Sequence, residues 1–324
     1  MHTGIRKRDE VKMSDLVSVI MSTYNEELKW IKESVNSILD QTYANFELII
    51  ILDNPGNMLL RNLLEEYAAK DNRIRLIINR ENIGLVKSLN IALKHCNGKY
   101  IARMDADDIS DKERLNNQKD YVEKNNLDFV FSGMKIIDEQ SIELYETNEN
   151  IMDSYKTKKL LQITNISNHP TWFLKAEIYK KLGGYREVSY CEDYDFSLRC
   201  LSRGYKIGRM NRNVIKYRIR ANSVSRSYSL EQFIISRGIL KLYKNNELED
   251  FKIVSDLIIK SQELANDKEK EKYIKADRKT NEAINLIKNG RPLRGIVEIT
   301  RSVILSKYCM MKYTDFLKYK ISGL

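Results

Sequence analysis

Apolar runs alternate with segments of helical periodicity over the first third of the chain. Short apolar runs, typical of buried strands, occupy residues 17–21, 46–52, 74–78 and 100–104. Between them, apolar residues recur every three to four positions, which predicts helices over residues 28–39, 58–69 and 84–96. Strands and helices in alternation form right-handed crossovers. The pattern therefore predicts an α/β fold with a mostly parallel sheet flanked by helices.

The pattern loosens after residue 134. Further short strands are expected at residues 128–134, 171–175 and 213–219, with a helix over 193–203 that ends at Gly204. Beyond residue 229 only helical periodicity remains. We therefore predict three parts, which are a flexible N-terminal tail (1–15), a main domain (16–228) and a C-terminal helical appendage (229–324).

The composition supports a large core and a preference for anionic partners. The chain has 324 residues, of which 42% are hydrophobic, and its formal net charge is +10. Residues 288–320 carry eight Lys or Arg and two acidic residues, more than half of that excess. A basic amphipathic segment of this kind binds an anionic membrane surface, or it packs on the main domain or on a second subunit. The sequence leaves both interpretations and the oligomeric state open.

Nothing in the sequence indicates secretion. The four cysteines form no CxxC pair, residues 1–14 contain no apolar segment, and the longest apolar run, residues 48–52, is too short to span a bilayer. We expect a cytoplasmic protein without a transmembrane helix, located on the inner face of the cell membrane if residues 288–320 bind there.

Polar clusters follow each of the four predicted parallel strands. They occupy residues 23–27, 53–54, 79–84 and 105–108. Ligands bind outside the carboxyl ends of the strands in an open parallel sheet, so these clusters should meet along one edge. The alternative is that each cluster caps the helix that follows it.

The run Asp105-Ala106-Asp107-Asp108 is the most informative of these clusters. Three carboxylates this close repel one another unless a cation or several donors lie among them. Mg²⁺ and Mn²⁺ prefer oxygen ligands and often share them with substrate phosphates. A departing diphosphate needs such a cation. The alternative is an acidic start to a helix beginning at residues 109–113.

These motifs together resemble glycosyltransferase family 2. The resemblance covers residues 16–226 and rests on Thr23-Tyr24-Asn25-Glu26, Asp53, Asn82-Ile83-Gly84 and Ala102-Arg103-Met104-Asp105-Ala106-Asp107-Asp108. It implies the GT-A fold, with its Rossmann-like sheet. It also implies metal-dependent, inverting transfer of a sugar from a nucleotide diphosphate sugar to a saccharide or polyprenyl-linked acceptor, as in surface polysaccharide synthesis.

The resemblance also implies roles for the residues of these motifs. Thr23 and Glu26 would lie beside the nucleoside, and Asp53 would accept a hydrogen bond from the base, which favours UDP over GDP and leaves dTDP open. Arg103 would approach the nucleotide or its phosphates. The remaining assignments are Asn25 and Asn82 to the nucleotide sugar, Asp105 to the ribose or the metal, and Asp107 to the metal, Mn²⁺ or Mg²⁺.

A second acidic motif, Glu192-Asp193, resembles the pair that opens a helix beneath the family's acceptor site. Asp193 would be the general base that takes the proton from the acceptor hydroxyl, and Glu192 is the fallback. The alternative is an ordinary acidic helix start, with Asp193 as N-cap and Arg199 as a surface charge. Gly183-Gly184 resembles the family's turn before the acceptor loop.

Three further residues are assigned to the nucleotide sugar. His169 precedes a predicted strand and would reach the diphosphate or the acceptor, although a hydrogen-bonded structural histidine is an alternative. Arg218 and Arg220 lie in a segment where the family commonly has histidine at the position of Arg220. Arginine does not ligate a metal, but it pairs with a phosphate.

Two other classes of function are alternatives. A sugar nucleotidyltransferase usually has a Gly-rich, basic loop after the first strand, and residues 23–27 have neither feature. A non-catalytic module would lack the carboxylates, or would bind nucleic acid through its positive charge. Nucleic-acid binding gives no reason for the acidic run at residues 105–108, so no nucleic-acid partner is expected.

Overall fold

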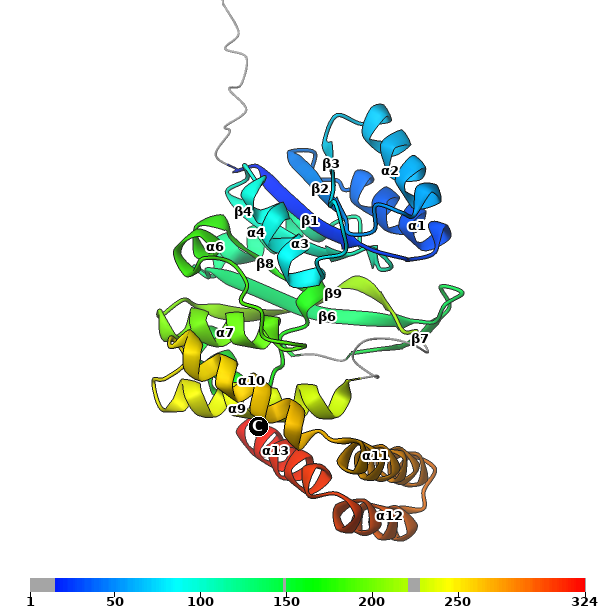
Figure 1. The fold of residues 1–324 in the computed structure, drawn as a ribbon, viewed down its shortest axis with the longest axis vertical. Helices are drawn as coiled ribbons and strands as arrows, with labels where there is room; N and C mark the ends of the chain where they lie inside the picture. The colour runs from blue at the N-terminus through cyan, green and yellow to red at the C-terminus, as the bar shows by residue number, and fades with distance from the viewer. Residues whose placement is uncertain (1–14, 148–149, 221–227, 324) are drawn as a thin grey trace, which may run out of the picture.

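The computed structural model describes residues 15–147, 150–220 and 228–323, so almost all of the tail predicted at residues 1–15 lies outside the described residues. The predicted parallel sheet is present (Figure 1). Its four strands pair in parallel in the order β3-β2-β1-β4. They are β1 Val17–Thr23, β2 Phe46–Leu52, β3 Ile74–Ile78 and β4 Tyr100–Asp105. The helices between them are α1 Leu28–Leu39, α2 Met58–Lys70 and α3 Leu85–Lys94.

Beyond β4 the sheet becomes mixed. It continues in the order β8-β6-β9-β5, with β7 paired to β6. The pairs β4–β8, β8–β6, β6–β7 and β9–β5 are antiparallel, whereas β6 and β9 run parallel. The strands are β5 Ile109–Ser110, β6 Phe129–Ile137, β7 Glu143–Glu146, β8 Phe173–Lys175 and β9 Ile207–Arg218. The helices are α4 Arg114–Lys124, α5 Ser154–Leu161, the 3₁₀ turn η2 His169–Thr171, α6 Ala176–Leu182 and α7 Glu192–Ser202.

The helix expected to begin at residues 109–113 is wrong. Ile109 and Ser110 instead form β5, which pairs with Lys216 and Ile215 of β9, and the next helix begins only at Arg114. The acidic run at residues 105–108 therefore precedes a strand and caps no helix. Its side chains interact with arginine residues instead.

Two apolar cores cover the two faces of the sheet. Because successive strand residues point to opposite faces, Val19 and Met21 pack toward α1, α2 and α4, whereas Ile20 packs toward α3, α6 and α7. The central strands are buried on both faces, which is why they read as continuous apolar runs. This arrangement fixes the carboxyl ends of β1, β2 and β4 at one edge.

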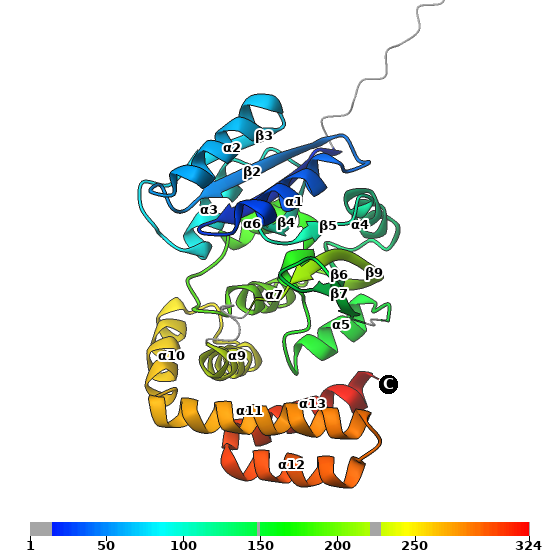
Figure 2. The ribbon, with the colours of Figure 1, turned by 90° about the vertical axis from the view of Figure 1, so that its right-hand side faces the viewer.

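The C-terminal region is helical, as predicted. It consists of α9 Ser229–Lys244, α10 Phe251–Leu264, α11 Asp267–Lys288, α12 Pro292–Leu305 and α13 Lys307–Gly323. Ile235 and Ile239 of α9 belong to the same core as α7, whereas α11 and α13 pack around a separate small cluster that contains Tyr273 and Tyr308. Both views place α11 to α13 at the end of the molecule away from the parallel strands (Figure 2). Among the helices of the described chain, none combines the length and apolar character needed to cross a bilayer.

Candidate active site

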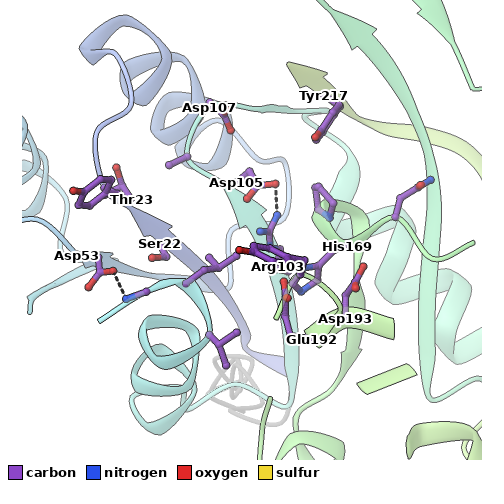
Figure 3. A pocket seen from close by; sticks show the side chains of 18 of the residues that line it. Ser22, Thr23, Asp53, Arg103, Asp105, Asp107, His169, Glu192, Asp193 and Tyr217 are labelled. Atoms are coloured by element: carbon purple, nitrogen blue, oxygen red, sulfur yellow. Dashed lines mark hydrogen bonds and ion pairs between the residues drawn. The ribbon is translucent and has the colours of Figure 1, made fainter. Parts of the chain in front are cut away.

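The predicted site residues meet in one pocket of about 940 Å³ at the carboxyl ends of β1, β2 and β4. Among its lining residues are all of the sequence-predicted ones except Asn82, namely Thr23, Asn25, Glu26, Asp53, Arg103, Asp105, Asp107, His169, Glu192, Asp193, Arg218 and Arg220. Figure 3 shows Thr23 and Asp53 on one side, Glu192 and Asp193 on another, and Arg103 between them. The pocket therefore joins motifs that lie far apart in the sequence, from Thr23 to Arg220, which are 197 residues apart.

Asp53 organises the loop that bounds one end of the pocket. Its Oδ1 accepts hydrogen bonds from Asn79 Nδ2 (2.7 Å) and the Ile83 amide (3.0 Å), and its Oδ2 accepts one from the Gly84 amide (2.8 Å). Gly84 has φ 85°, a conformation that favours glycine. The carboxylate thus shapes the loop before α3, and Oδ2 keeps capacity for one more donor. Asn82, whose Oδ1 accepts from the Gly84 amide at 3.1 Å, supports the same turn without lining the pocket.

The loop after β1 is held by its own polar side chains. Glu26 accepts hydrogen bonds from Thr23 Oγ1 (2.6 Å) and the Tyr24 amide (2.8 Å). Asn25 Oδ1 accepts from Asn54 Nδ2 (2.7 Å). The helix-capping alternative fails for Glu26 and Asn25, because the N-cap of α1 is Glu27 and it makes no side-chain cap.

The acidic run lies at the centre of the pocket, next to three arginines. Asp105 pairs with Arg103, and Asp107 Oδ2 lies 2.9 Å from Arg220 Nε. Burial and the charge of Asp105 raise the pKa of Asp107 to about 6. Burial and both neighbouring carboxylates also raise the pKa of Asp108, whose buried Oδ2 has no hydrogen-bond partner. At Asp107 and Asp108, burial and the neighbouring carboxylates thus outweigh the favourable effect of the nearby arginines.

This donor set fits a divalent cation that is shared with a substrate. In the described part of the chain, no three His, Cys, Asp or Glu side chains converge on one point. Mg²⁺ is nonetheless commonly held by one or two carboxylates plus substrate phosphates. Asp107 and Asp105 provide such carboxylates, and the raised pKa of Asp107 indicates that added positive charge would be stabilising there. Because Arg220 pairs with Asp107, a cation would compete with it or share that carboxylate.

Arg103 is buried and faces the pocket. Burial alone lowers the pKa of the Arg103 guanidinium, but its pairing with Asp105 more than offsets this, so the group stays charged. Its buried Nε makes no hydrogen bond within the described structure. A buried donor without a partner is costly, so Arg103 is available to an anionic ligand.

Arg218 and Arg220 have different environments, although only one residue separates them. Arg218 is buried, and its guanidinium donates to the Asp107 carbonyl oxygen (2.8 Å), the Asp138 carbonyl oxygen (3.0 Å) and Glu33 Oε2 (2.6 Å). These bonds use its donors to hold the acidic run in place. Arg220 is about one-third exposed and is therefore the arginine of the two that is open to a phosphate.

Asp193 lies on the opposite wall, at the start of α7. Its Oδ2 accepts a hydrogen bond from Asn165 Nδ2 (2.9 Å), and its Oδ1 accepts one from the Tyr194 amide (2.6 Å). Burial raises the pKa of Asp193 above its ordinary value, although both hydrogen bonds lower it in part. Burial and the charge of Asp193 raise the pKa of Glu192 to about 7. A half-buried carboxylate with a raised pKa is suited to accept a proton.

The alternative interpretation of this motif is wrong in two details. The N-cap of α7 is Cys191 rather than Asp193, and it makes no side-chain cap. Arg199 is buried instead of being a surface charge, because Asp195 pairs with it (2.8 Å) and also with Arg186. Gly183 and Gly184 both have positive φ, and they form the predicted turn.

His169 is buried beside Arg103 and ends a chain of hydrogen bonds. Its Nε2 lies 2.8 Å from Tyr185 Oη, which lies 2.7 Å from Tyr179 Oη. Burial and the charge of Arg103 lower the pKa of His169 well below its ordinary value, so the imidazole is neutral at pH 7. The structure thus supports the hydrogen-bonded structural alternative, and a neutral His169 still lines the pocket.

Several pocket residues were missed from the sequence. They include Asn165, Ser167, Tyr190, Tyr217, Tyr228 and Gln232. Tyr217 directly precedes Arg218, so the segment that contains Arg218 and Arg220 was a signal for it. Tyr190 directly precedes the Cys191-Glu192-Asp193 motif, and that position was the available signal. Asn165, Tyr228 and Gln232 carry no local pattern, because only the fold brings them to the pocket.

Comparisons with known proteins agree with this geometry. The family model described as "Glycosyl transferase family 2" matches residues 18–183. The chain is 41% identical over 214 residues to the uncharacterized glycosyltransferase MJ1057 of Methanocaldococcus jannaschii, covering 65% of this chain and 74% of that protein. It is 34% identical over 243 residues to the O-antigen biosynthesis glycosyltransferase WbnJ of Escherichia coli, covering 71% and 93%. The crystal structure of S. aureus TarS 1-349 in complex with UDP-GlcNAc has a similar fold, with a TM-score of 0.57, 17% identity and coverage of 94% and 90%.

Proposed function

The chain belongs to glycosyltransferase family 2 and transfers a glycosyl group from a nucleotide sugar, and from this premise we propose that it inverts the anomeric centre, with Asp193 as base. The observation that carries the proposal is that Asp107, which follows β4, and Asp193, in the first turn of α7, line the same pocket. Asp107 pairs with Arg220, whereas Asp193 accepts a hydrogen bond from the neutral side-chain amide of Asn165. Such a pocket suits a charged leaving group at one end and a proton transfer at the other.

The proposed reaction is a direct displacement. Asp193 accepts the proton of the acceptor hydroxyl as its oxygen bonds to the anomeric carbon, and the bond from that carbon to the diphosphate oxygen breaks. Attack on the face opposite the leaving group inverts the configuration. A divalent cation, Mn²⁺ or Mg²⁺, held by Asp107 and Asp105 would neutralise charge on the departing diphosphate. Arg103 and Arg220 are positioned to bind phosphate oxygens.

The donor is proposed to be a UDP-sugar. Asp53 Oδ2 retains acceptor capacity at the pocket edge, which suits the N–H of uracil. TarS, whose fold this chain shares, was solved with UDP-GlcNAc, so this donor is the first to test. WbnJ acts in O-antigen biosynthesis, which favours a saccharide or lipid-linked saccharide of a surface polysaccharide as the acceptor here.

A donor screen tests the proposal. Release of nucleoside diphosphate is measured for UDP-, dTDP- and GDP-sugars with Mn²⁺, Mg²⁺ or EDTA. Asp193→Asn should bind the donor normally and lose transfer by ~10²–10⁴-fold, the usual contribution of one positioned base. Asp120→Asn, an exposed carboxylate on α4 outside the pocket, is the matched control. Near-normal transfer by Asp193→Asn would show that Asp193 is not the base.

We also propose that α12 docks the enzyme on an anionic membrane surface. This helix buries its small and polar side against α11. Gly295 approaches α11 so closely that an added Cβ would lie 2.5 Å from Ile287, Glu298 pairs with Lys279 (3.0 Å), and Ser302 Oγ lies 3.0 Å from Thr280 Oγ1. The apolar side consequently faces solvent. Leu293 is 80% exposed and Ile304 79% exposed, with Ile296 and Val297 between them.

The charges around this face favour an anionic bilayer over a second copy of the chain. Every charged residue from Lys288 to Lys307 other than Glu298 is basic and exposed, and Glu298 is buried. Two such faces would repel each other, whereas each Lys or Arg near an anionic bilayer adds ~1 kcal/mol. Figures 1 and 2 place α12 at one end of the molecule, where no described element covers it.

Vesicle sedimentation tests the membrane proposal. The protein should sediment with phosphatidylglycerol vesicles in low salt and remain in solution with phosphatidylcholine vesicles. Ile296→Ser with Ile304→Ser should abolish sedimentation, whereas Ile259→Ser, an exposed isoleucine of α10, should not. Equal sedimentation of all variants, or a wild-type dimer that the α12 substitutions dissociate, would refute it.

A further inference from the structure

One wall of the pocket is built from two tyrosines to which no role has been assigned. Tyr190 lies just before α7, and Tyr228 lies just before α9, so they come from segments 38 residues apart. Their rings stack with centroids 4.3 Å apart and an angle of 12° between the planes. Both line the pocket, and Tyr228 is 40% exposed. A stacked aromatic pair that lines a pocket, with one ring exposed and the other half-buried, offers a flat apolar surface.

The backbone at Tyr190 is held in an unfavourable conformation. Its φ of 61° is uncommon for any residue other than glycine, and especially for a bulky one. The surrounding contacts maintain it, because Gln232 Nε2 donates to the Tyr190 carbonyl oxygen (2.9 Å) and Cys191 Sγ donates to the Gln232 carbonyl oxygen (3.3 Å). Strain that the surroundings maintain in this way is characteristic of ligand sites. Here α9 of the C-terminal region fixes the orientation of Tyr190.

The position of the pair places it on the acceptor side. Tyr190 is three residues before Asp193, whereas the loops after β1, β2 and β4 form the opposite wall. Polar groups surround the pair, including Glu187, Ser189 and Gln232, which also line the pocket. A flat aromatic surface beside hydrogen-bonding groups matches a pyranose ring, which has an apolar C–H face and a rim of hydroxyls. The electron-rich face of a phenol ring attracts such C–H groups.

We propose that Tyr190 and Tyr228 form the platform on which the acceptor sugar stacks, with its reacting hydroxyl directed toward Asp193. This proposal rests on the transferase function above and adds a subsite to it. It also gives α9 a functional part, because Tyr228 is the N-cap residue of this helix, at the predicted boundary, and Gln232 lies within it. Acceptor choice would then depend on both parts of the chain.

The test separates acceptor binding from donor binding. UDP-sugar affinity is measured by calorimetry, and KM and kcat are measured with the methyl glycosides of glucose, galactose and N-acetylglucosamine as acceptors. With the best of these, Tyr228→Ala should raise the acceptor KM about tenfold, as expected for loss of one stacking contact. Donor affinity should not change, and kcat should change by less than about threefold. Tyr228→Phe keeps the ring and should restore KM to within about twofold of wild type.

The controls distinguish failure of this proposal from failure of the proposed function. Tyr155→Ala, an exposed tyrosine of α5 outside the pocket, should change neither constant. If wild type transfers sugar but Tyr228→Ala has an unchanged acceptor KM, the platform is refuted and the transferase stands. An equal loss of donor affinity would place the pair at the donor and also refute the platform. If the wild type neither binds nor consumes any nucleotide sugar, the proposed function itself fails.

Discussion

Removal of the Asn165 side chain tests how the proposed base is tuned. Asn165 Nδ2 donates to Asp193 Oδ2 at 2.9 Å, and its Oδ1 accepts from the Ser167 amide (3.1 Å) and Ser167 Oγ (2.8 Å), which fixes the amide orientation. The Nδ2 group of Asn165 therefore points at the Asp193 carboxylate and stabilises its ionised form. This opposes the rise in the pKa of Asp193 that burial causes. Asn165→Ala should raise this pKa further.

The size of the effect follows from the type of bond. A hydrogen bond to a charged group contributes about 1.5–3 kcal/mol. Since each 1.4 kcal/mol corresponds to a factor of ten, the acid dissociation constant of Asp193 should fall roughly tenfold to hundredfold in Asn165→Ala. The base form of Asp193 is present above its pKa and is lost as the pH falls. Asn165→Ala should therefore lose transfer most at low pH and recover as the pH rises.

The assay is the pH profile of kcat/KM for the acceptor from pH 5 to 9, with donor saturating. The acid limb of Asn165→Ala should lie at higher pH than that of wild type. Asn168→Ala is the matched control, because Asn168 lines the same pocket but donates to the Ser132 carbonyl oxygen (2.9 Å), and it should leave the limb in place. A loss of the same factor at every pH would refute the reasoning, since Asn165 would then act by another route.

Three further predictions concern the acidic residues. Glu192→Gln should keep most transfer and move the acid limb to lower pH, because a neutral neighbour lowers the pKa of Asp193; a kinetic pH profile checks this. Asp107→Asn should remove the part of donor affinity that depends on Mn²⁺, so that calorimetry with EDTA gives equal values for variant and wild type. Asp195→Ala should lower the free energy of unfolding by about 3–5 kcal/mol, measured in urea, because it leaves the buried Arg199 and the half-buried Arg186 without their carboxylate partner.

The parallel half of the fold was predictable because its information is local. Each buried strand is a short apolar run. The polar residues that follow it lie at the edge of the sheet, and this position depends on the strand itself rather than on distant parts of the chain. The mixed half depends on distant partners. Ile109 and Ser110 looked like a helix start because no nearby residue reveals that β9, more than 100 residues later, pairs with them. The register of a strand with a distant partner leaves little trace in the local sequence.

The same distinction explains the site. Asp53, Asp105, Asp107 and Asp193 lie in compact motifs, so the sequence marked them. Tyr228 became a pocket residue only through the packing of α9 on α7, and Arg199 became a buried residue only through Asp195 and the turn that brings Arg186 to it. The C-terminal helices were predicted from periodicity, but periodicity does not say that the apolar side of α12 would face solvent.

The first turn of α7 shows how partners decide what a carboxylate does. Glu192, Asp193 and Asp195 share one helix start, where Asp195 is buried and the other two are half-buried. Asp195 is paired with two guanidinium groups, which stabilise its charge permanently and make it a poor proton acceptor. The hydrogen bonds to Asp193 come from neutral amides, which stabilise its ionised form less than a guanidinium group would, and burial raises its pKa. The pKa of Glu192 is raised to about 7, and because Glu192 and Asp193 interact, the two carboxylates titrate as a pair. A base must hold a proton for part of each cycle. Asp193 suits this role because it lines the pocket and accepts two hydrogen bonds from neutral amides, which favour its ionised form without pairing it to a guanidinium group.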